Sequence, residues 1–162
     1  MRARTYRTLL ELGGGLGLLV AIFAAAEVVY PGLSAVCSVN ALISCTTVLN
    51  SGRTTTLGLP DWAWGVGGFL AILILMVVAD RNRNQVAWTY GLLGVTSLGV
   101  VLSAYFLYVE VFEIGALCPV CITAYLFGAL AWVGAAGLTR RRRARLGAQG
   151  AGGRQPGDDS PS

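Results

Sequence analysis

Two cysteines separated by two residues are the sharpest chemical signal in this sequence, in the segment Cys118-Pro119-Val120-Cys121. Cysteines at this spacing can close a small, reversible disulfide. Pro119 suits the first turn of a helix, because its missing N–H would have no partner there anyway. We therefore expect Cys118 at the N-cap and Cys121 in the first turn, where the positive end of the helix dipole stabilises a thiolate. Such a thiolate is suited to attack a disulfide or another electrophile.

A second pair, Cys37 and Cys45, has seven residues between its members. Both lie in a polar stretch from about residue 30 to residue 60, which is rich in Ser, Thr, Asn and Gly and has no obvious regular structure. A long loop of this kind is usually functional or mobile. The pair is either a static staple or a relay that exchanges its disulfide with the first pair.

Tyr125 follows Cys121 by four residues, so on a helix it lies on the same face, one turn further on. A buried phenol needs a hydrogen-bond partner, and the carbonyl of a bound quinone is one candidate. The alternative is an aromatic residue at the membrane interface, where such residues are enriched. The position of Tyr125 alone does not decide between these two interpretations.

Four long apolar blocks must position these residues, at about 9–29, 62–79, 86–109 and 119–138. The chain is 55% hydrophobic and only 12% charged, with a mean hydropathy of +0.66. Each block is long enough for a helix to cross a hydrocarbon layer of about 30 Å. Because four segments cannot close a β-barrel, the blocks must be helices. We predict an all-α, integral membrane four-helix bundle in residues 1–138, with an extracytoplasmic loop that carries Cys37 and Cys45 between helices 1 and 2.

Arginine placement predicts the orientation. The N-terminus, the connection at 80–85 and the segment after residue 138 hold every arginine except Arg53. Four crossings put these three segments on one side, and the excess of arginine marks that side as the cytoplasm. Both termini are thus predicted in the cytoplasm and the cysteines on the outer face. Residues 139–162 are predicted to be a basic, disordered tail. The same placement argues against a nucleic-acid partner for the net charge of +4.

Three alternatives stay open from the residues alone. The first block could be a cleaved signal peptide, with cleavage near Ala24-Ala25-Ala26. The four thiols could together bind zinc in a metal-binding or metal-delivery protein, although the chain has no histidine. A structural or assembly protein with two inert disulfides is the third alternative. Four cysteines allow three full disulfide pairings, so their spacing alone does not determine which disulfides form.

The chain resembles the bacterial form of the vitamin K epoxide reductase family. The matching features are the spacing of Cys37 and Cys45, Leu57-Gly58-Leu59-Pro60-Asp61 before the second block, and Cys118-Pro119-Val120-Cys121 with Tyr125 four residues on. With the four blocks, the resemblance covers roughly residues 9–138. It implies a four-helix bundle around a quinone, capped by the outer loop. The quinone, menaquinone or ubiquinone, would be an electron-accepting substrate, and no metal would be needed.

The resemblance also implies roles for single residues. Cys118 and Cys121 would be the active-site pair, with Cys121 facing the quinone. Cys45 would shuttle to Cys118, and Cys37 would meet the partner thiol. The residues implied at the quinone are Tyr125, Asp61 and Ser51. Asp61 falls where vertebrate members carry a quinone-binding asparagine, and Ser51 matches a loop serine that supports the active site.

Many bacterial members carry a fused thioredoxin-like domain after the fourth helix, and this chain has a basic tail there instead. The resemblance then implies a separate, extracytoplasmic thioredoxin-like thiol oxidase as the partner. The predicted function is that of a thiol:quinone oxidoreductase in the bacterial cell membrane. It would reoxidise this partner and so support disulfide formation in exported proteins.

Overall fold

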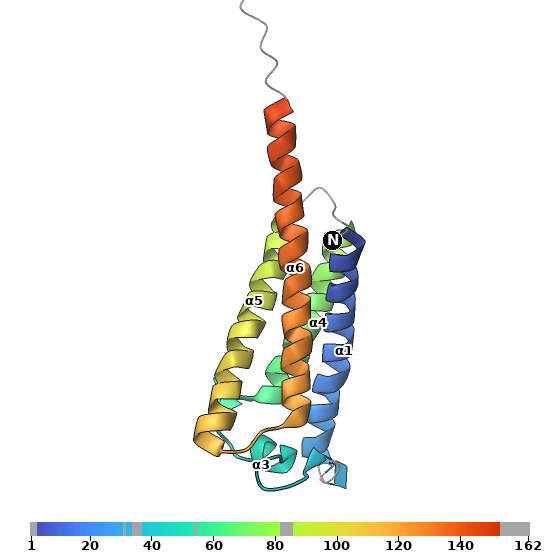
Figure 1. The fold of residues 1–162 in the computed structure, drawn as a ribbon. Helices are drawn as coiled ribbons and strands as arrows, with labels where there is room; N and C mark the ends of the chain where they lie inside the picture. Colours follow the sequence, from blue (N-terminus) through green and yellow to red (C-terminus); the bar gives the residue numbers. More distant parts are fainter. Residues whose placement is uncertain (1–2, 31, 34–36, 54, 82–85, 153–162) are drawn as a thin grey trace, which may run out of the picture.

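Four long helices stand side by side in the computed structural model of this protein, which describes residues 3–30, 32–33, 37–53, 55–81 and 86–152 (Figure 1). The helices are α1 (Ala3–Val29), α4 (Asp61–Arg81), α5 (Val86–Tyr108) and α6 (Pro119–Gly152). Each contains a stretch long and apolar enough to cross a membrane. The prediction of an all-α membrane bundle is therefore confirmed.

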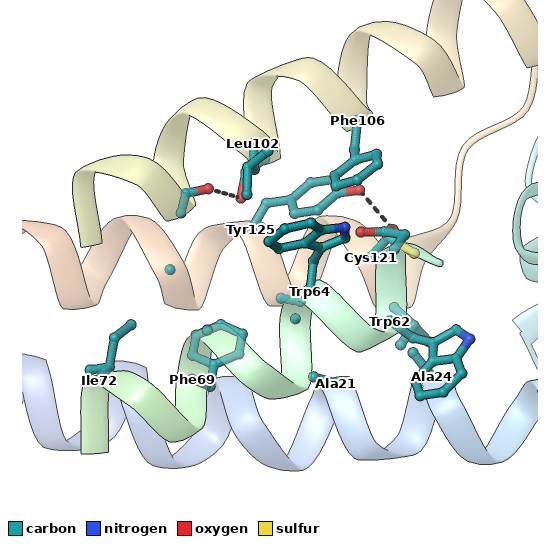
Figure 2. Close-up of a pocket in the computed structure, with 18 of the residues that line it drawn as sticks. Ala21, Ala24, Trp62, Trp64, Phe69, Ile72, Leu102, Phe106, Cys121 and Tyr125 are labelled. Carbon is teal, nitrogen blue, oxygen red and sulfur yellow. Dashed lines mark hydrogen bonds between the residues drawn. The ribbon is translucent and has the colours of Figure 1, made fainter. Parts of the chain in front are cut away.

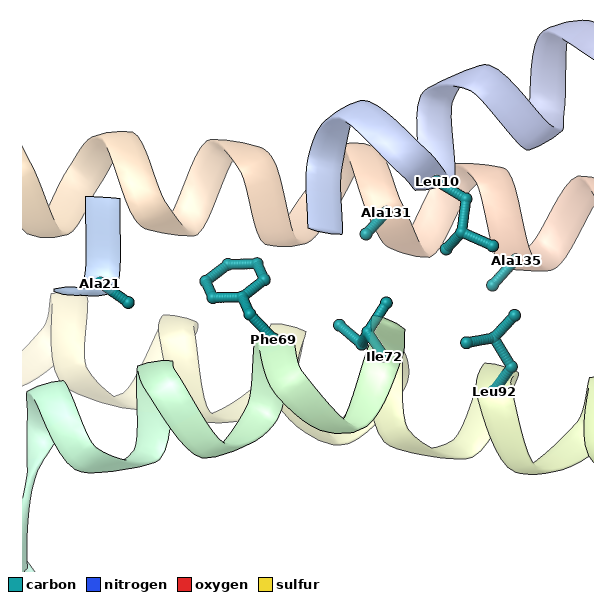
Figure 3. Close-up of a cluster of buried hydrophobic side chains, with 7 residues drawn as sticks. All are labelled: Leu10, Ala21, Phe69, Ile72, Leu92, Ala131 and Ala135. Atoms are coloured by element: carbon teal, nitrogen blue, oxygen red, sulfur yellow. The ribbon is translucent and has the colours of Figure 1, made fainter. Parts of the chain in front are cut away.

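The bundle closes around a small apolar core. α1 packs mainly against α6 and α4, and α5 packs against the same two helices from the other side. The core side chains come from all four helices (Figure 3): Leu10, Ala21, Phe69, Ile72, Leu92, Ala131 and Ala135. Large apolar side chains also cover the outside, where Leu126 is 62% exposed and Val101 64%. Such a surface suits lipid, because a soluble monomer rarely exposes apolar patches of this extent.

Small residues bring α1 and α6 into close contact. A Cβ atom built on Gly13 of α1 would lie 2.7 Å from the carbonyl oxygen of Phe127, and one on Gly134 of α6 would lie 2.7 Å from that of Tyr6. Such contacts are too short for any side chain. Membrane helices associate largely through close backbone packing of this kind, since lipid removes the hydrophobic driving force between them. These glycines therefore position α6, the helix that carries Cys121 and Tyr125.

The polar stretch between α1 and α4 contains more regular structure than the sequence indicated. It includes a short helix, α3 (Cys45–Leu49), and a two-stranded antiparallel hairpin of β1 (Thr55–Thr56) and β2 (Leu59–Pro60). After α5, the chain continues as a π-helical turn, η1 (Val109–Ile114), which ends at Gly115 with a φ of 70°. These short elements lie together at one end of the bundle and form the cap over the cysteines.

The predicted tail is partly wrong. α6 was expected to end near Leu138, but it continues as a helix to Gly152. The physical reason is composition, because Arg, Ala, Leu and Gln in residues 139–149 are all good helix formers. Residues 153–162 lie outside the described part of the chain, as do residues 82–85 of the arginine-bearing connection. The N-terminus and the arginine-rich end of α6 lie at the end of the bundle opposite to α3 (Figure 1).

Candidate active site

Cys118 and Cys121 lie at the start of α6, as the sequence predicted. The helix begins at Pro119, and the Cys121 backbone N–H donates to the Cys118 Sγ at 3.3 Å. Cys118 therefore acts as the N-cap, with its sulfur satisfying one of the free N–H groups of the first turn. Both thiols are free and buried, with exposures of 0% and 4%. Because both thiols are buried, a reagent in water cannot contact them directly. Electrons must reach them through another group of the protein or from the membrane.

Cys37 and Cys45 are joined by a disulfide, with their Cα atoms 5.8 Å apart. Cys45 is the first residue of α3 and is fully buried. Ser44 caps this helix, since its Oγ accepts the Thr47 backbone N–H at 3.2 Å. Of the four thiols that the zinc alternative requires, Cys37, Cys45 and Cys118 have their Sγ atoms within 4.8 Å of one another, and two of these three are joined in this disulfide.

A backbone bridge brings the two cysteine pairs together. Ile43 and Leu117 form an isolated parallel β-bridge. In it, the Ser44 N–H donates to the Leu117 carbonyl at 3.1 Å, and the Leu117 N–H donates to the Leu42 carbonyl at 2.8 Å.

Because Leu117 directly precedes Cys118 and Ser44 directly precedes Cys45, this bridge sets the distance between the two cysteines. The Cys118 Sγ lies 3.2 Å from the Cys45 Sγ. That separation places a free thiol in contact with a disulfide, which is the arrangement that thiol–disulfide exchange requires. A purely structural disulfide would need no such neighbour.

Tyr125 connects the cysteines to two buried acids. Its Oη donates to the Glu110 Oε1 at 2.8 Å and makes a longer contact of 3.4 Å with the Asp61 Oδ2. Glu110 is fully buried and Asp61 is 8% exposed. The Cys121 Sγ and one carboxylate oxygen from each acid all lie within 4.8 Å of one another. A phenol has one proton to donate, so the shorter bond to Glu110 is the dominant one.

Glu110 was not among the residues predicted at the site. Hydropathy predicts the third helix at about 86–109, and Glu110 directly follows this block. A signal was nevertheless present, since an acid at the end of an apolar span is a default functional candidate. The π-helical turn η1 directs Glu110 inward, whereas Glu113 of the same turn points outward and pairs with Arg53 at 3.3 Å.

An apolar pocket lies beside Cys121 and Tyr125, between α1, α4, α5 and α6 (Figure 2). Trp62, Trp64 and Phe69 of α4 and Phe106 of α5 form much of its wall, and Asp61 also lines it. Its cavity volume is about 90 Å³. Small-molecule sites usually hold at least ~300 Å³, so a quinone ring would enter only if some of these side chains moved.

The structure does not bring Ser51 to this pocket. Its Oγ donates to the Val48 carbonyl at 2.8 Å and accepts the Arg53 backbone N–H at 3.3 Å. The serine therefore closes the last turn of α3 rather than lining the pocket. The other predicted site residues, Asp61, Tyr125 and the four cysteines, lie in one continuous cluster.

The fold and the site together define a class of protein: a four-helix membrane bundle in which a buried dithiol contacts a disulfide of the capping loop, next to an apolar pocket. A family model described as the vitamin K epoxide reductase family matches residues 8–136. The chain belongs to the vitamin K epoxide reductase family. It is accordingly a multi-pass membrane thiol–disulfide oxidoreductase with a quinone as its redox partner.

Proposed function

We propose that this protein reoxidises a separate, extracytoplasmic thioredoxin-like protein and passes the electrons through its two cysteine pairs to a membrane quinone. This activity would support disulfide formation in exported proteins. The observation that carries the proposal is the 3.2 Å contact between the Cys118 Sγ and the Cys45 Sγ of the Cys37–Cys45 disulfide. Two isolated disulfides would not need this contact, whereas a relay depends on it.

The electron path begins in the capping loop. A partner thiolate attacks Cys37, and Cys45 leaves as a thiolate that attacks the Cys118 sulfur of an oxidised Cys118–Cys121 pair. The second partner thiol then releases Cys37, which displaces Cys118 from Cys45. The partner has become a disulfide, the loop disulfide has re-formed, and Cys118 and Cys121 hold two electrons as a dithiol. The pairing found in the structure corresponds to this last state.

The dithiol is then oxidised by the quinone, which accepts two electrons and two protons to become a quinol. The apolar pocket beside Cys121 supports this step, because quinone rings and tails partition into apolar surroundings. Tyr125 and Asp61 line that pocket together with Cys121. As the family resemblance implies, the Tyr125 hydroxyl would donate to the quinone carbonyl oxygen, and a protonated Asp61 would donate there as well.

The proposed orientation places the cysteine end outside the cytoplasm. The opposite end carries the arginines of α1 and α6, and cytoplasmic loops have an excess of positive residues. Disulfides form and persist in the oxidising compartment outside the cytoplasm. The charge of one end and the redox chemistry of the other thus support the same orientation in a bacterial cell membrane.

Anaerobic turnover with a reduced partner tests this function. The protein would be purified in detergent and mixed with a reduced thioredoxin-like protein, and loss of free thiols would be followed with and without menaquinone or ubiquinone. We expect thiol loss that depends on the quinone and appears as one quinol for each partner disulfide. If partner thiols were never lost, with an intact Cys37–Cys45 disulfide and both quinones supplied, this function would be excluded.

A further inference from the structure

Glu110 is fully buried, and both of its carboxylate oxygens are engaged with the active-site helix. Oε2 accepts the Cys118 backbone N–H at 3.1 Å, and Oε1 accepts the Tyr125 hydroxyl at 2.8 Å. The acid therefore contacts the start of the helix and a point about two turns further on, on either side of Cys121. Its own backbone is held as well, since its carbonyl accepts the Ala116 N–H at 3.2 Å.

The hydrogen-bond inventory of this cluster has a chemical consequence. A quinone carbonyl oxygen can only accept, and Tyr125 has one proton, which it gives to Glu110. Tyr125 can donate to a quinone only when its hydroxyl no longer donates to Glu110. A protonated Glu110 makes this possible, because its carboxyl then donates to the phenol oxygen instead of accepting from it. The bonds then run in one direction, from the Glu110 carboxyl to the Tyr125 hydroxyl and on to the quinone oxygen.

We propose that Glu110 supplies protons to the quinone through Tyr125 during oxidation of the Cys118–Cys121 dithiol. This inference rests on the proposed function. Oxidation of the two thiols releases two electrons and two protons, and the quinone takes up both. The Cys121 Sγ lies within 4.8 Å of carboxylate oxygens of Glu110 and Asp61, which can receive the thiol protons. At the end, the cysteines form a disulfide, the quinone is a quinol, and the acids and Tyr125 are unchanged.

Two substitutions at Glu110 separate proton transfer from positioning. Glu110→Gln keeps the length of the side chain and an acceptor for the Cys118 N–H, but it cannot carry a proton. Glu110→Asp keeps the carboxyl and shortens the side chain. Proton transfer therefore predicts that the aspartate variant is the faster of the two, whereas a positioning role predicts the opposite order. Glu113→Gln is the matched control, because Glu113 lies in the same turn but is exposed.

The measurement is single-turnover oxidation of the fully reduced, full-length protein by menadione, a soluble quinone, in stopped flow. We expect Glu110→Gln to slow oxidation by about 100-fold, the lower end of usual general acid catalysis. Oxidation of Glu110→Asp should be at least about tenfold faster than that of Glu110→Gln, and the rate for Glu113→Gln should stay within about twofold of wild type. Reduction of the Cys37–Cys45 disulfide by dithiothreitol should stay unchanged in every variant, which also verifies that the fold is intact.

Two failures are distinguishable. A wild-type protein that menadione does not oxidise would overturn the proposed function, and this inference with it. A wild type that is oxidised normally, with Glu110→Gln as fast as or faster than Glu110→Asp, would overturn the inference alone.

A second, independent feature lies at the other end of the bundle, where a cavity of about 410 Å³ opens between α1, α4, α5 and α6. Five arginines line it: Arg4, Arg7, Arg141, Arg142 and Arg145. Asp80 is the only acid among the described lining residues, and it pairs with Arg7 at 3.1 Å. Apolar side chains such as Leu10, Met76 and Leu138 line the same cavity.

Orientation alone requires positive residues on this side of the membrane, but not their convergence on one cavity. Guanidinium groups bind phosphate oxygens through paired hydrogen bonds, and basic pockets between membrane helices bind anionic lipid head groups. The extension of α6 beyond Leu138 is what brings Arg141 and Arg145 to the arginines of α1. We propose that this cavity binds the phosphate of an anionic phospholipid, with the acyl chain along its apolar wall.

Native mass spectrometry of the detergent-purified protein tests this site with phosphatidylglycerol, phosphatidylcholine and inorganic phosphate. We expect retention of phosphatidylglycerol that falls at least about tenfold in Arg141→Gln/Arg145→Gln, since the loss of even one charge-assisted hydrogen bond accounts for a change of that size. Arg140→Gln is the matched control, because Arg140 is exposed on the same helix and does not line the cavity.

Three results would overturn the lipid site. They are equal retention of phosphatidylcholine, undiminished retention in the double variant with an unchanged thermal midpoint, and displacement of phosphatidylglycerol by an equal concentration of inorganic phosphate. The last result would assign the cavity to a soluble phosphate.

Discussion

Replacing Cys121 by serine should abolish quinone-dependent turnover, with a loss of more than about 1000-fold, because a covalent mechanism has no route without its nucleophile. The variant retains Cys118, whose sulfur is 3.2 Å from that of Cys45. Because the Cys118–Cys121 disulfide cannot form in this variant, an electron pair from the partner has no acceptor at the start of α6. Turnover would be measured as quinol formed with a reduced thioredoxin-like partner, under anaerobic conditions.

The same variant should also reveal the exchange between the two pairs. With no Cys121 to pair with, the Cys118 thiolate can attack Cys45 of the loop disulfide and release Cys37, so part of the protein should carry a Cys45–Cys118 disulfide with Cys37 as a free thiol. Peptide mass spectrometry without reductant would detect this link. Thr123→Ala is a suitable control, since Thr123 is exposed on the same helix. Normal turnover by Cys121→Ser would remove Cys121 from the mechanism, and a missing Cys45–Cys118 link would argue against the relay.

Replacing Cys45 by alanine should separate the two halves of the reaction. Cys118 is fully buried beneath Cys45, so a protein partner cannot reach it directly. We expect partner-driven turnover to fall by more than about 100-fold, as for removal of any covalent relay group. Oxidation of the chemically reduced Cys118–Cys121 pair by menadione should stay within about threefold of wild type, because the apolar pocket and Tyr125 are untouched.

Cys37→Ala gives the comparison. It leaves Cys45 as a free thiol beside Cys118, so it should lose partner-driven turnover and still form the Cys45–Cys118 link. Cys45→Ala cannot form that link. Partner-driven turnover that survived in Cys45→Ala would mean that electrons enter at Cys118 or Cys121 without the loop, and the order of transfer proposed above would be wrong.

Much of the fold was predictable because the membrane limits the choices. An apolar block of sufficient length has to be a helix in lipid, so residues such as those of α4 and α5 could be assigned from hydropathy alone. The paired cysteines and Tyr125 were also accessible, since Pro119 marks a helix start and a four-residue spacing defines a helix face. These inferences depend on local sequence only.

The rest depended on contacts between distant segments. The Ile43–Leu117 bridge joins residues far apart in the chain and leaves no local pattern, so the cysteine spacing alone did not place Cys45 against Cys118, and only the family resemblance implied an exchange between them. Glu110 was missed because a π-helical turn reorients the end of the third span. The extension of α6 was missed for a different reason, since its high charge was interpreted as disorder although its residues favour a helix.

Because α6 is one unbroken helix, its rise per residue relates the depths of its side chains in the bilayer to one another. Tyr125 and Arg141 are sixteen residues apart on it, a distance of about 24 Å at 1.5 Å per residue. If the arginines stay at one boundary of a hydrocarbon layer about 30 Å thick, the tyrosine lies only about 6 Å from the other. The quinone ring must therefore rise almost to the surface of the opposite leaflet to react, while its isoprenoid tail remains in the bilayer.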